Sequence, residues 1–120
     1  MTGRPDLPFS EAVRFGPFLF LSGQIGTDST NARLVAGGIG PETAQAIANL
    51  RAVLERHGSS LSRVIKCTVI LADLKEWGAM NAVYAPLFAG HLPARTAIGG
   101  ASLVMGARVE LDCVAAAGPV

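Results

Sequence analysis

Hydrophobic and polar positions along the chain predict strands near both ends and helices in the middle. Residues 12–25 read as two strands around a turn at residues 16–17, and the apolar run FLFL at residues 18–21 is typical of a strand covered on both sides. The stretch 27–40 is rich in Gly, Asn, Asp, Ser and Thr, which predicts a loop with at most a short strand at residues 33–35.

A first helix is predicted over residues 41–57. Ile47, Leu50 and Leu54 recur there at helical spacing, and Pro41 suits the first helical position, where its missing N–H costs nothing.

A second helix is predicted after Asp73, because Glu76 three residues later completes a capping-box pattern. Pro86 predicts a kink or an early end, because a proline inside a helix costs about 3 kcal/mol. We interpret the apolar face of this helix as core, and it consists of Trp77, Met80, Tyr84, Leu87 and Phe88.

Three further strands are predicted at residues 64–71, 94–100 and 107–116, from their β-branched residues and partial alternation. Runs of strands mixed with only two helices favour an α+β fold, with both helices on one face of the sheet. The other face then needs cover, which a neighbouring subunit would supply.

Composition supports an assembly of subunits. The 120 residues suit one domain, and only 16% of them are charged, against about 25% in ordinary soluble domains. This deficit predicts surface buried in a closed homo-oligomer. The net charge of +1 without a basic run argues against nucleic acid as a main partner, and no apolar run approaches the roughly 20 residues of a membrane span.

Two further features of the sequence bear on the compartment. The first residues, MTGRPDLPFSEAV, do not resemble a secretory signal. Cys67 and Cys113 lie far apart in apolar strands, so we expect two buried thiols in a reducing compartment, the cytoplasm.

Arg95 is the most unusual charged residue. It is the only Asp, Glu, Lys or Arg between Glu76 and Arg108, and it stands in the apolar stretch LPARTAIGG. If the last two strands are antiparallel neighbours, Arg95 and Glu110 share one side of the sheet. The two residues then form either a neutralising ion pair or an arginine fork for a small carboxylate, beside an acid that handles water. The glycines at positions 99–100 would leave room for such a ligand.

Other motifs carry less weight. The loop AGGIGPE lacks the lysine and the spacing of phosphate-binding loops, so it reads as a plain loop. His57 and His91 stand alone, without carboxylates or cysteines at ligand spacing, and no metal site is predicted. Ser22 is not in a GxSxG elbow, which argues against a serine hydrolase.

These segments together resemble a known family. FSEAVRFGPFLFLSGQIG, the helix ETAQAIANLRAVLERHGSS and the stretch from NAVYAPLF through LPART to VELD are similar, in order, to the reactive-intermediate deaminase family. This family is also called RidA, YjgF or L-PSP endoribonuclease. The likeness runs from about Phe9 to Ala116, and the segment PART, followed by an apolar strand and VELD, is its most specific part.

The resemblance implies one RidA-like domain over residues 1–120, with a chorismate-mutase-like mixed sheet and two helices packed on one face. It also implies a barrel-like homotrimer with a cleft at each subunit interface. The implied activity is hydrolysis of 2-enamine and 2-imino acids, such as 2-aminoacrylate, to 2-oxo acids and ammonia, without a cofactor.

The resemblance also assigns residues. Arg95 matches the arginine that binds the substrate carboxylate, and Glu110 matches the acid that positions or activates water. Asn81 and the backbone at residues 22–23 (Ser22 and Gly23) match positions that line the cleft. Two substrate-contact positions depart from the pattern, because Phe9 stands where many members have tyrosine and Ala97 where many have cysteine.

Two other functions stay open at this point. One is a non-catalytic trimer that binds small carboxylates as a sensor. The other is a ribonuclease, translation-inhibitor or protein-interaction role, against which the scattered charge argues.

Overall fold

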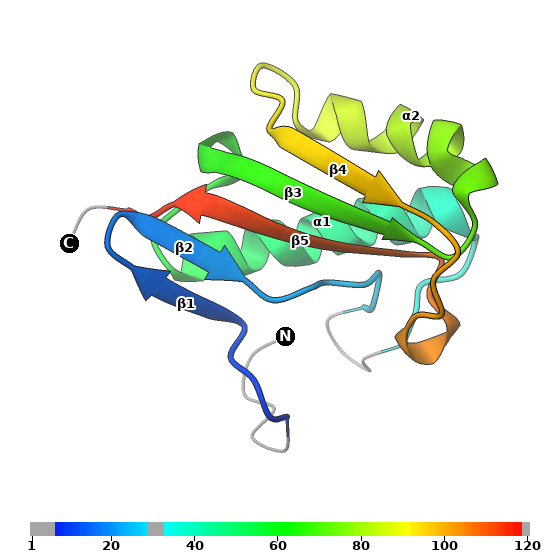
Figure 1. Cartoon of the computed structure of the whole chain (residues 1–120), viewed down its shortest axis with the longest axis horizontal. Helices are drawn as coiled ribbons and strands as arrows, with labels where there is room; N and C mark the ends of the chain where they lie inside the picture. Colours follow the sequence, from blue (N-terminus) through cyan, green and yellow to red (C-terminus); the bar gives the residue numbers. More distant parts are fainter. Residues whose placement is uncertain (1–6, 29–32, 119–120) are drawn as a thin grey trace.

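A five-stranded mixed sheet with two helices on one face forms the protein, as the α+β prediction requires (Figure 1). The computed structural model describes residues 7–28 and 33–118. The sheet order is β1-β2-β5-β3-β4, and only the β3–β4 pair is parallel. The elements are β1 (Ala12–Phe15), β2 (Phe18–Leu21), α1 (Ile39–Arg56), β3 (Val64–Leu71), α2 (Trp77–Leu87), β4 (Ala94–Ile98) and β5 (Val109–Ala116).

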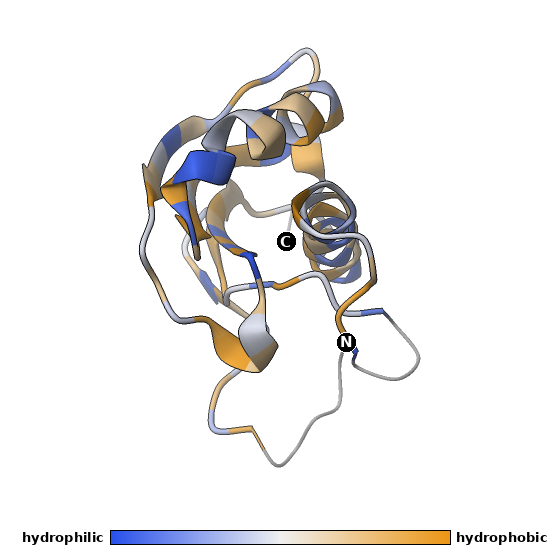
Figure 2. Cartoon of the chain, turned by 90° about the vertical axis from the view of Figure 1, so that its right-hand side faces the viewer, coloured by the Kyte–Doolittle hydropathy of each residue, from blue (hydrophilic) through white to orange (hydrophobic). Residues whose placement is uncertain are grey.

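The core lies between the sheet and the two helices, which Figure 2 shows on the same side of the sheet. Every second residue of β5 is buried, beginning with Val109, and α1 contributes Ile47, Leu50 and Leu54 to the same core, as its spacing predicts. On α2, Met80 and Tyr84 are buried, as is Phe88 just after the helix, whereas Trp77 is 47% exposed. The apolar stripe of α2 is therefore core only in part.

The opposite face of the sheet is open and strongly apolar at the β1–β2 hairpin. The register pairs Val13 with Phe20 and Phe15 with Phe18, so these four side chains share the face that points away from the helices. All four are exposed, Phe15 by 76%. An apolar patch of this kind typically marks an interaction surface.

The ends of the helices differ in detail from the prediction. Helix α1 begins at Ile39, two residues early, because Gly38 takes a left-handed conformation with φ of 86° and turns the chain into the helix. Pro41 is then the third helical residue, and it loses nothing, since the first four N–H groups of a helix have no intrahelical partner. Pro86 lies in the last turn of α2, which ends at Leu87, so the predicted early end is confirmed.

Only half of the predicted capping box forms before α2. The Asp73 carboxylate accepts a hydrogen bond from the backbone N–H of Lys75 at 2.9 Å. The Glu76 carboxylate instead accepts a hydrogen bond from Nε of Arg108 at 2.5 Å. Residues 74–76 form a 3₁₀ turn.

The last two strands are shorter than predicted. Strand β4 stops at Ile98, and β5 starts at Val109 after a 3₁₀ turn at residues 104–106. The predicted short strand at residues 33–35 is reduced to an isolated bridge between Leu34 and Thr27.

The prediction of two separate buried thiols is wrong. The β3–β5 register pairs Cys67 directly with Cys113, their Cα atoms are 4.1 Å apart, and the two side chains form a disulfide in the core. The sequence could not reveal this pairing, because it depends on register between strands 46 residues apart. The prediction of a reducing compartment depended on free thiols, so the disulfide removes its basis. No helix in the described part of the chain is long and apolar enough to span a membrane.

Candidate active site

Arg95 lies on the edge strand β4 and faces the helices. The register places it beside Cys67 of β3, whose side chain is in the core. Its guanidinium carbon lies 4.9 Å from the ring centroid of Tyr84 and 5.8 Å from that of Trp77, and Nη1 contacts the sulfur of Met80 at 4.0 Å. Among residues 7–28 and 33–118, no carboxylate lies within ion-pair distance of Arg95. The guanidinium is therefore held by aromatic faces and not neutralised within the described chain.

A cavity of about 350 Å³ opens beside this guanidinium, between α2 and the start of β4. Its size is at the lower end of the range for small-molecule sites. Besides Arg95, it is lined by Trp77, Asn81, Tyr84, Ala85, Leu92 and Pro93. One permanent positive charge in a mainly apolar cavity is the arrangement expected for a small organic anion.

Two buried polar atoms of this lining have no hydrogen-bond partner within the described chain. They are Oδ1 of Asn81 and the hydroxyl of Tyr84. Leaving such an atom unpaired costs about 1–3 kcal/mol. Burial raises the pKa of the Tyr84 hydroxyl, while the positive charge of Arg95 acts in the opposite direction. The hydroxyl is therefore protonated and able to donate at neutral pH.

Glu110 lies on the other face of the sheet. It pairs with Ile70 of β3, between the buried positions Val109 and Leu111, and so points away from the helices. Its carboxylate packs against Gly23, where an added Cβ would collide with Oε2. Burial raises the pKa of the Glu110 carboxyl, and the nearby charge of Asp112 raises it further.

Ser22 and the segment around Phe9 lie next to this glycine. The Ser22 hydroxyl donates to the backbone carbonyl of Ser10 at 2.5 Å, and its N–H donates to that of Glu11 at 2.9 Å. Phe9, directly before Ser10, is 59% exposed. The structure therefore places together Ser22, Gly23 and Glu110. Phe9 is next in sequence to Ser10, which Ser22 contacts.

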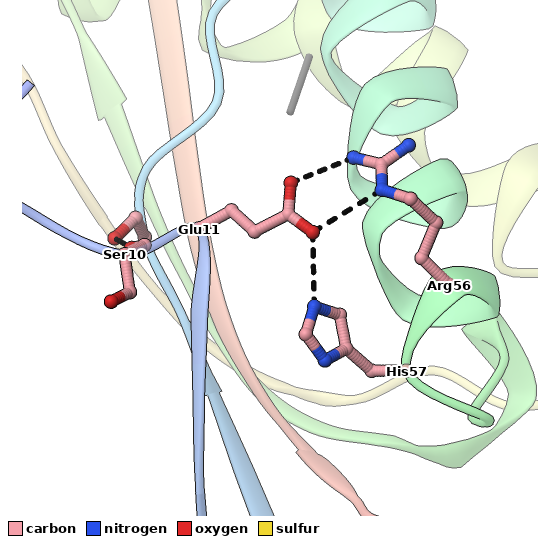
Figure 3. Close-up of polar contacts among 5 residues, drawn as sticks. Ser10, Glu11, Arg56 and His57 are labelled. Carbon is pink, nitrogen blue, oxygen red and sulfur yellow. Dashed lines mark hydrogen bonds and ion pairs between the residues drawn. The ribbon is translucent and has the colours of Figure 1, made fainter. Parts of the chain in front are cut away.

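A polar network fixes the same segment to the helix layer (Figure 3). The Glu11 carboxylate accepts hydrogen bonds from Arg56 at 2.8 and 3.2 Å and lies 2.9 Å from Nε2 of His57. The Arg56 guanidinium is the main cause that lowers the pKa of Glu11. His57 is the C-cap residue of α1 and also anchors this segment.

The structure does not bring Arg95 and Glu110 together within one chain. The condition that their strands are neighbours fails, because β3 lies between β4 and β5. Two strand spacings amount to roughly 10 Å, and the register sets Glu110 level with Ile98, three residues or roughly 10 Å beyond Arg95. The two side chains also point to opposite faces, so the predicted ion pair between them does not form in the chain.

Residues 97–100 follow Arg95 along the edge of the sheet. Ala97 shares the face of Arg95 and packs partly against the core. The expectation that Gly99 leaves room for a ligand is wrong, because Leu74 fills that space: a Cβ at Gly99 would lie 2.6 Å from the Leu74 Cβ. Gly100 has a positive φ of 74° with open space around it, and it turns the chain after β4.

Sequence reasoning missed Tyr84 and Trp77 as site residues, because helical spacing alone assigned them to the core. One signal was available, since the polar Asn81 interrupts the apolar face three residues before Tyr84. Three residues apart on a helix are neighbours, so a polar side chain there predicts that the stripe borders something other than core.

Comparisons with known proteins agree with the fold and with the resemblance in sequence. The family model described as Endoribonuclease L-PSP matches residues 2–117. The mouse (Mus musculus) 2-iminobutanoate/2-iminopropanoate deaminase is 41% identical over 112 residues, which are 93% of this chain and 83% of the mouse protein.

Two solved structures show the same fold. RidA of an Antarctic Psychrobacter is 32% identical with a TM-score of 0.86, over 91% of this chain and 88% of that one. Escherichia coli TdcF with bound serine is 27% identical with a TM-score of 0.85, over 91% and 87% of the two chains. The chain therefore belongs to the RidA/YjgF family, whose family model carries the endoribonuclease L-PSP description.

Proposed function

We propose that this protein hydrolyses reactive 2-imino acids, and their 2-enamine tautomers such as 2-aminoacrylate, to 2-oxo acids and ammonia. The observation that carries the proposal is Arg95, a guanidinium without a carboxylate partner in the described chain, beside a cavity of about 350 Å³. A guanidinium matches the two oxygens of a carboxylate with parallel N–H donors. The name of the mouse relative, an imine deaminase, supports this reaction class.

The proposed site is completed by a second copy of the chain. Arg95 and Glu110 lie on opposite faces of one sheet, so a single copy does not present both to one small molecule. We propose a homotrimer, in which the cavity at Arg95 of one copy meets the Glu110 group of its neighbour, with Phe9, Ser22 and Gly23. The exposed apolar face of the β1–β2 hairpin supports burial between copies.

In the proposed reaction Arg95 holds the carboxylate and fixes the neighbouring C2 atom in place. An enamine first takes up a proton at C3 to become the iminium. Water then adds through its oxygen to C2, and one of its protons passes to the Glu110 carboxylate. Glu110 returns that proton to the nitrogen, the C2–N bond breaks, and ammonia leaves as the hydroxyl loses its proton to give the ketone. Asn81 and Ala97 line the site, and no cofactor takes part.

The test is an imine-trapping assay. Threonine and threonine dehydratase generate 2-iminobutanoate, and its loss is followed with purified protein and without it. Wild type should speed the loss, and Arg95→Ala should reduce the rate by roughly 10- to 150-fold, the value of a hydrogen bond to a charged group. Arg51→Ala, at an exposed position of α1, is the matched control. If wild type equals the protein-free reaction, the deaminase proposal is wrong.

A non-catalytic carboxylate sensor is the second candidate. The arrangement within one chain favours it, because the anion-binding half of the site is formed without Glu110. This function predicts that small carboxylates stabilise wild type but not Arg95→Ala against heat, while no imine is turned over in any assay.

A further inference from the structure

The segment of residues 7–11, directly before β1, is held by polar contacts at its end. Residues 7–10 are exposed, Phe9 by 59%, so packing in the core does not fix the course of this segment. Within the described chain, its hydrogen bonds and ion pairs are made by Ser10 and Glu11. These two residues therefore decide where the segment lies.

Contacts from two sides hold this end of the segment. On one side, the Ser22 N–H and hydroxyl donate to the backbone carbonyls of Glu11 and Ser10, at 2.9 and 2.5 Å. On the other side, the Glu11 carboxylate accepts from Nε and Nη2 of Arg56 and lies 2.9 Å from Nε2 of His57 (Figure 3). The two donors of Arg56 form a bidentate fork, which fixes the orientation of a carboxylate. The contacts of Glu11 with Arg56 and His57 together form the Glu11 clamp.

This clamp contributes little to the stability of the fold. The side chains of Glu11 and Arg56 are 20% and 37% exposed, and ion pairs between such groups add little to the free energy of folding. The carboxylate also lies at the C-terminal end of α1, where the helix dipole disfavours negative charge. The contacts instead supply direction, because they fix one carboxylate to two neighbouring side chains of a helix.

The clamped segment is connected with the Glu110 carboxylate through Ser22. Gly23 follows Ser22 directly and packs against Oε2 of Glu110. Gln24 then pairs with the strand that carries Glu110, because its N–H and carbonyl exchange hydrogen bonds of 2.8 and 3.0 Å with Leu111. Direct contacts therefore lead from the clamped segment to Glu110.

We propose that Glu11 is a positioning residue for imine hydrolysis, because its clamp on the end of α1 fixes the backbone against which the Glu110 carboxylate packs. Glu11 acts through these contacts and does not touch the substrate. When the clamp opens, the segment moves away from Ser22, the backbone beside Glu110 loosens, and the carboxylate adopts other rotamers. The inference rests on the proposed function for the role of Glu110 in handling water.

The kinetic test uses the 2-iminobutanoate trap, well below the melting temperature. Glu11→Ala and Arg56→Ala should each lower kcat by roughly 5- to 30-fold, a part of the 10²–10⁴-fold that a general base contributes, while KM changes by less than about threefold. Glu11→Gln keeps an oxygen that accepts from Arg56, so its kcat should stay within about twofold of wild type. The melting temperature of Glu11→Ala should fall by less than about 5 °C.

Double variants show whether the effect follows this route. Glu11→Ala combined with Arg56→Ala should be within about twofold of either variant alone, because both open the same clamp. In a Glu110→Gln background, Glu11→Ala should cost less than about twofold, because the group that it positions is already lost. Glu55→Ala removes an exposed carboxylate from the same turn of α1 and is the matched control, with kcat unchanged.

Hydrogen exchange measures the clamp without turnover. The Ser22 amide, which donates to Glu11, should exchange at least about threefold faster in Glu11→Ala and in Arg56→Ala than in wild type. The Ala72 amide, which donates to the Arg108 carbonyl just beyond β3, should exchange at the wild-type rate in both variants.

The outcomes separate this inference from the deaminase proposal. Unchanged exchange of the Ser22 amide in both variants would overturn the clamp, whatever the activity. Faster exchange with wild-type kcat, or fully additive losses from Glu11→Ala and Glu110→Gln, would overturn the positioning role and leave the proposed function intact. If wild type turns over no imine, the proposed function is refuted and the positioning role with it, while the exchange of Ser22 still shows whether the clamp holds the segment.

Discussion

Replacing Gly23 by alanine should impair the reaction while leaving the fold and the carboxylate site intact. In the structure an added Cβ at this position would collide with Oε2 of Glu110 and lie 2.9 Å from its Cδ. The colliding atoms are the end of a flexible side chain and not backbone. Glu110 can therefore turn away, and the proposed water-handling carboxylate loses its position.

Gly23→Ala should have two effects of different size, a small loss of stability and a larger loss of rate. Turning Glu110 out of its preferred rotamer costs about 0.5–1.5 kcal/mol, which lowers the melting temperature of a chain of this length by only a few degrees, roughly 2–6 °C. A general base contributes about 10²–10⁴-fold to a rate, so displacing it should lower kcat by at least about tenfold. The added Cβ is directed at Glu110, and Arg95 keeps its guanidinium and its cavity, so the affinity for a small carboxylate such as pyruvate should fall by less than kcat does.

The assay is the 2-iminobutanoate trap, combined with a double-mutant cycle. If Gly23→Ala acts through Glu110, then Gly23→Ala with Glu110→Gln should be no slower than Glu110→Gln alone. Gly99→Ala is the contrasting variant, because there the Cβ would meet the backbone and Cβ of Leu74 and destabilise the fold itself. Wild-type kcat in Gly23→Ala, or fully additive losses in the double variant, would refute the role given to Glu110.

Three further predictions concern the rest of the fold. Joining Cys67 to Cys113, 46 residues apart, restricts the unfolded chain by about 4 kcal/mol, so reduction should lower the melting temperature by roughly 10–20 °C, and unchanged melting would count against the disulfide. The pKa of Glu11 is lowered mainly by Arg56, so its contribution to stability is present above pH 4.5 and lost as the pH falls through the folded-state pKa; Glu11→Gln should flatten the pH dependence of chemical denaturation in that acidic range. Phe20→Asp on the open face should shift the mass in light scattering from trimer to monomer without changing the circular dichroism, and a trimer that persists would place the interface elsewhere.

Local sequence patterns were sufficient to predict the helices and strands and which face of each element is buried. The spacing of Ile47, Leu50 and Leu54 reports burial directly, because a helix brings such positions onto one side. Alternation in β5 likewise placed Glu110 opposite the core positions. Arg95 stood out because a lone charge in an apolar stretch is costly unless the fold has a use for it.

Relations between distant strands could not be derived in this way. Whether β4 adjoins β5 or β3 depends on the crossover through α2, and the assumption that the last two strands are neighbours put Arg95 and Glu110 on one side. The disulfide likewise depends on the register between β3 and β5, which the sequence does not indicate. Trp77 borders the cavity instead of the core, whereas Tyr84 lies in the core as predicted and also lines the cavity, which helical spacing alone does not indicate.

The separation of Arg95 and Glu110 within one chain leads to a last prediction. If each site takes Arg95 from one copy and Glu110 from its neighbour, Arg95→Ala and Glu110→Ala are each inactive alone but repair one another when mixed. In trimers formed by refolding equal amounts of both, a site is intact when an Arg95-bearing copy meets a Glu110-bearing neighbour, a probability of one half squared. About a quarter of wild-type activity should therefore return. Wild type mixed with the double variant contains the same proportion of intact Arg95 and of intact Glu110 and serves as the control for exchange, because its activity should fall to about a quarter when sites are shared between copies and to about a half when they are not. A mixture of the two single variants that stays as inactive as either alone would mean that both residues serve a site within the same copy.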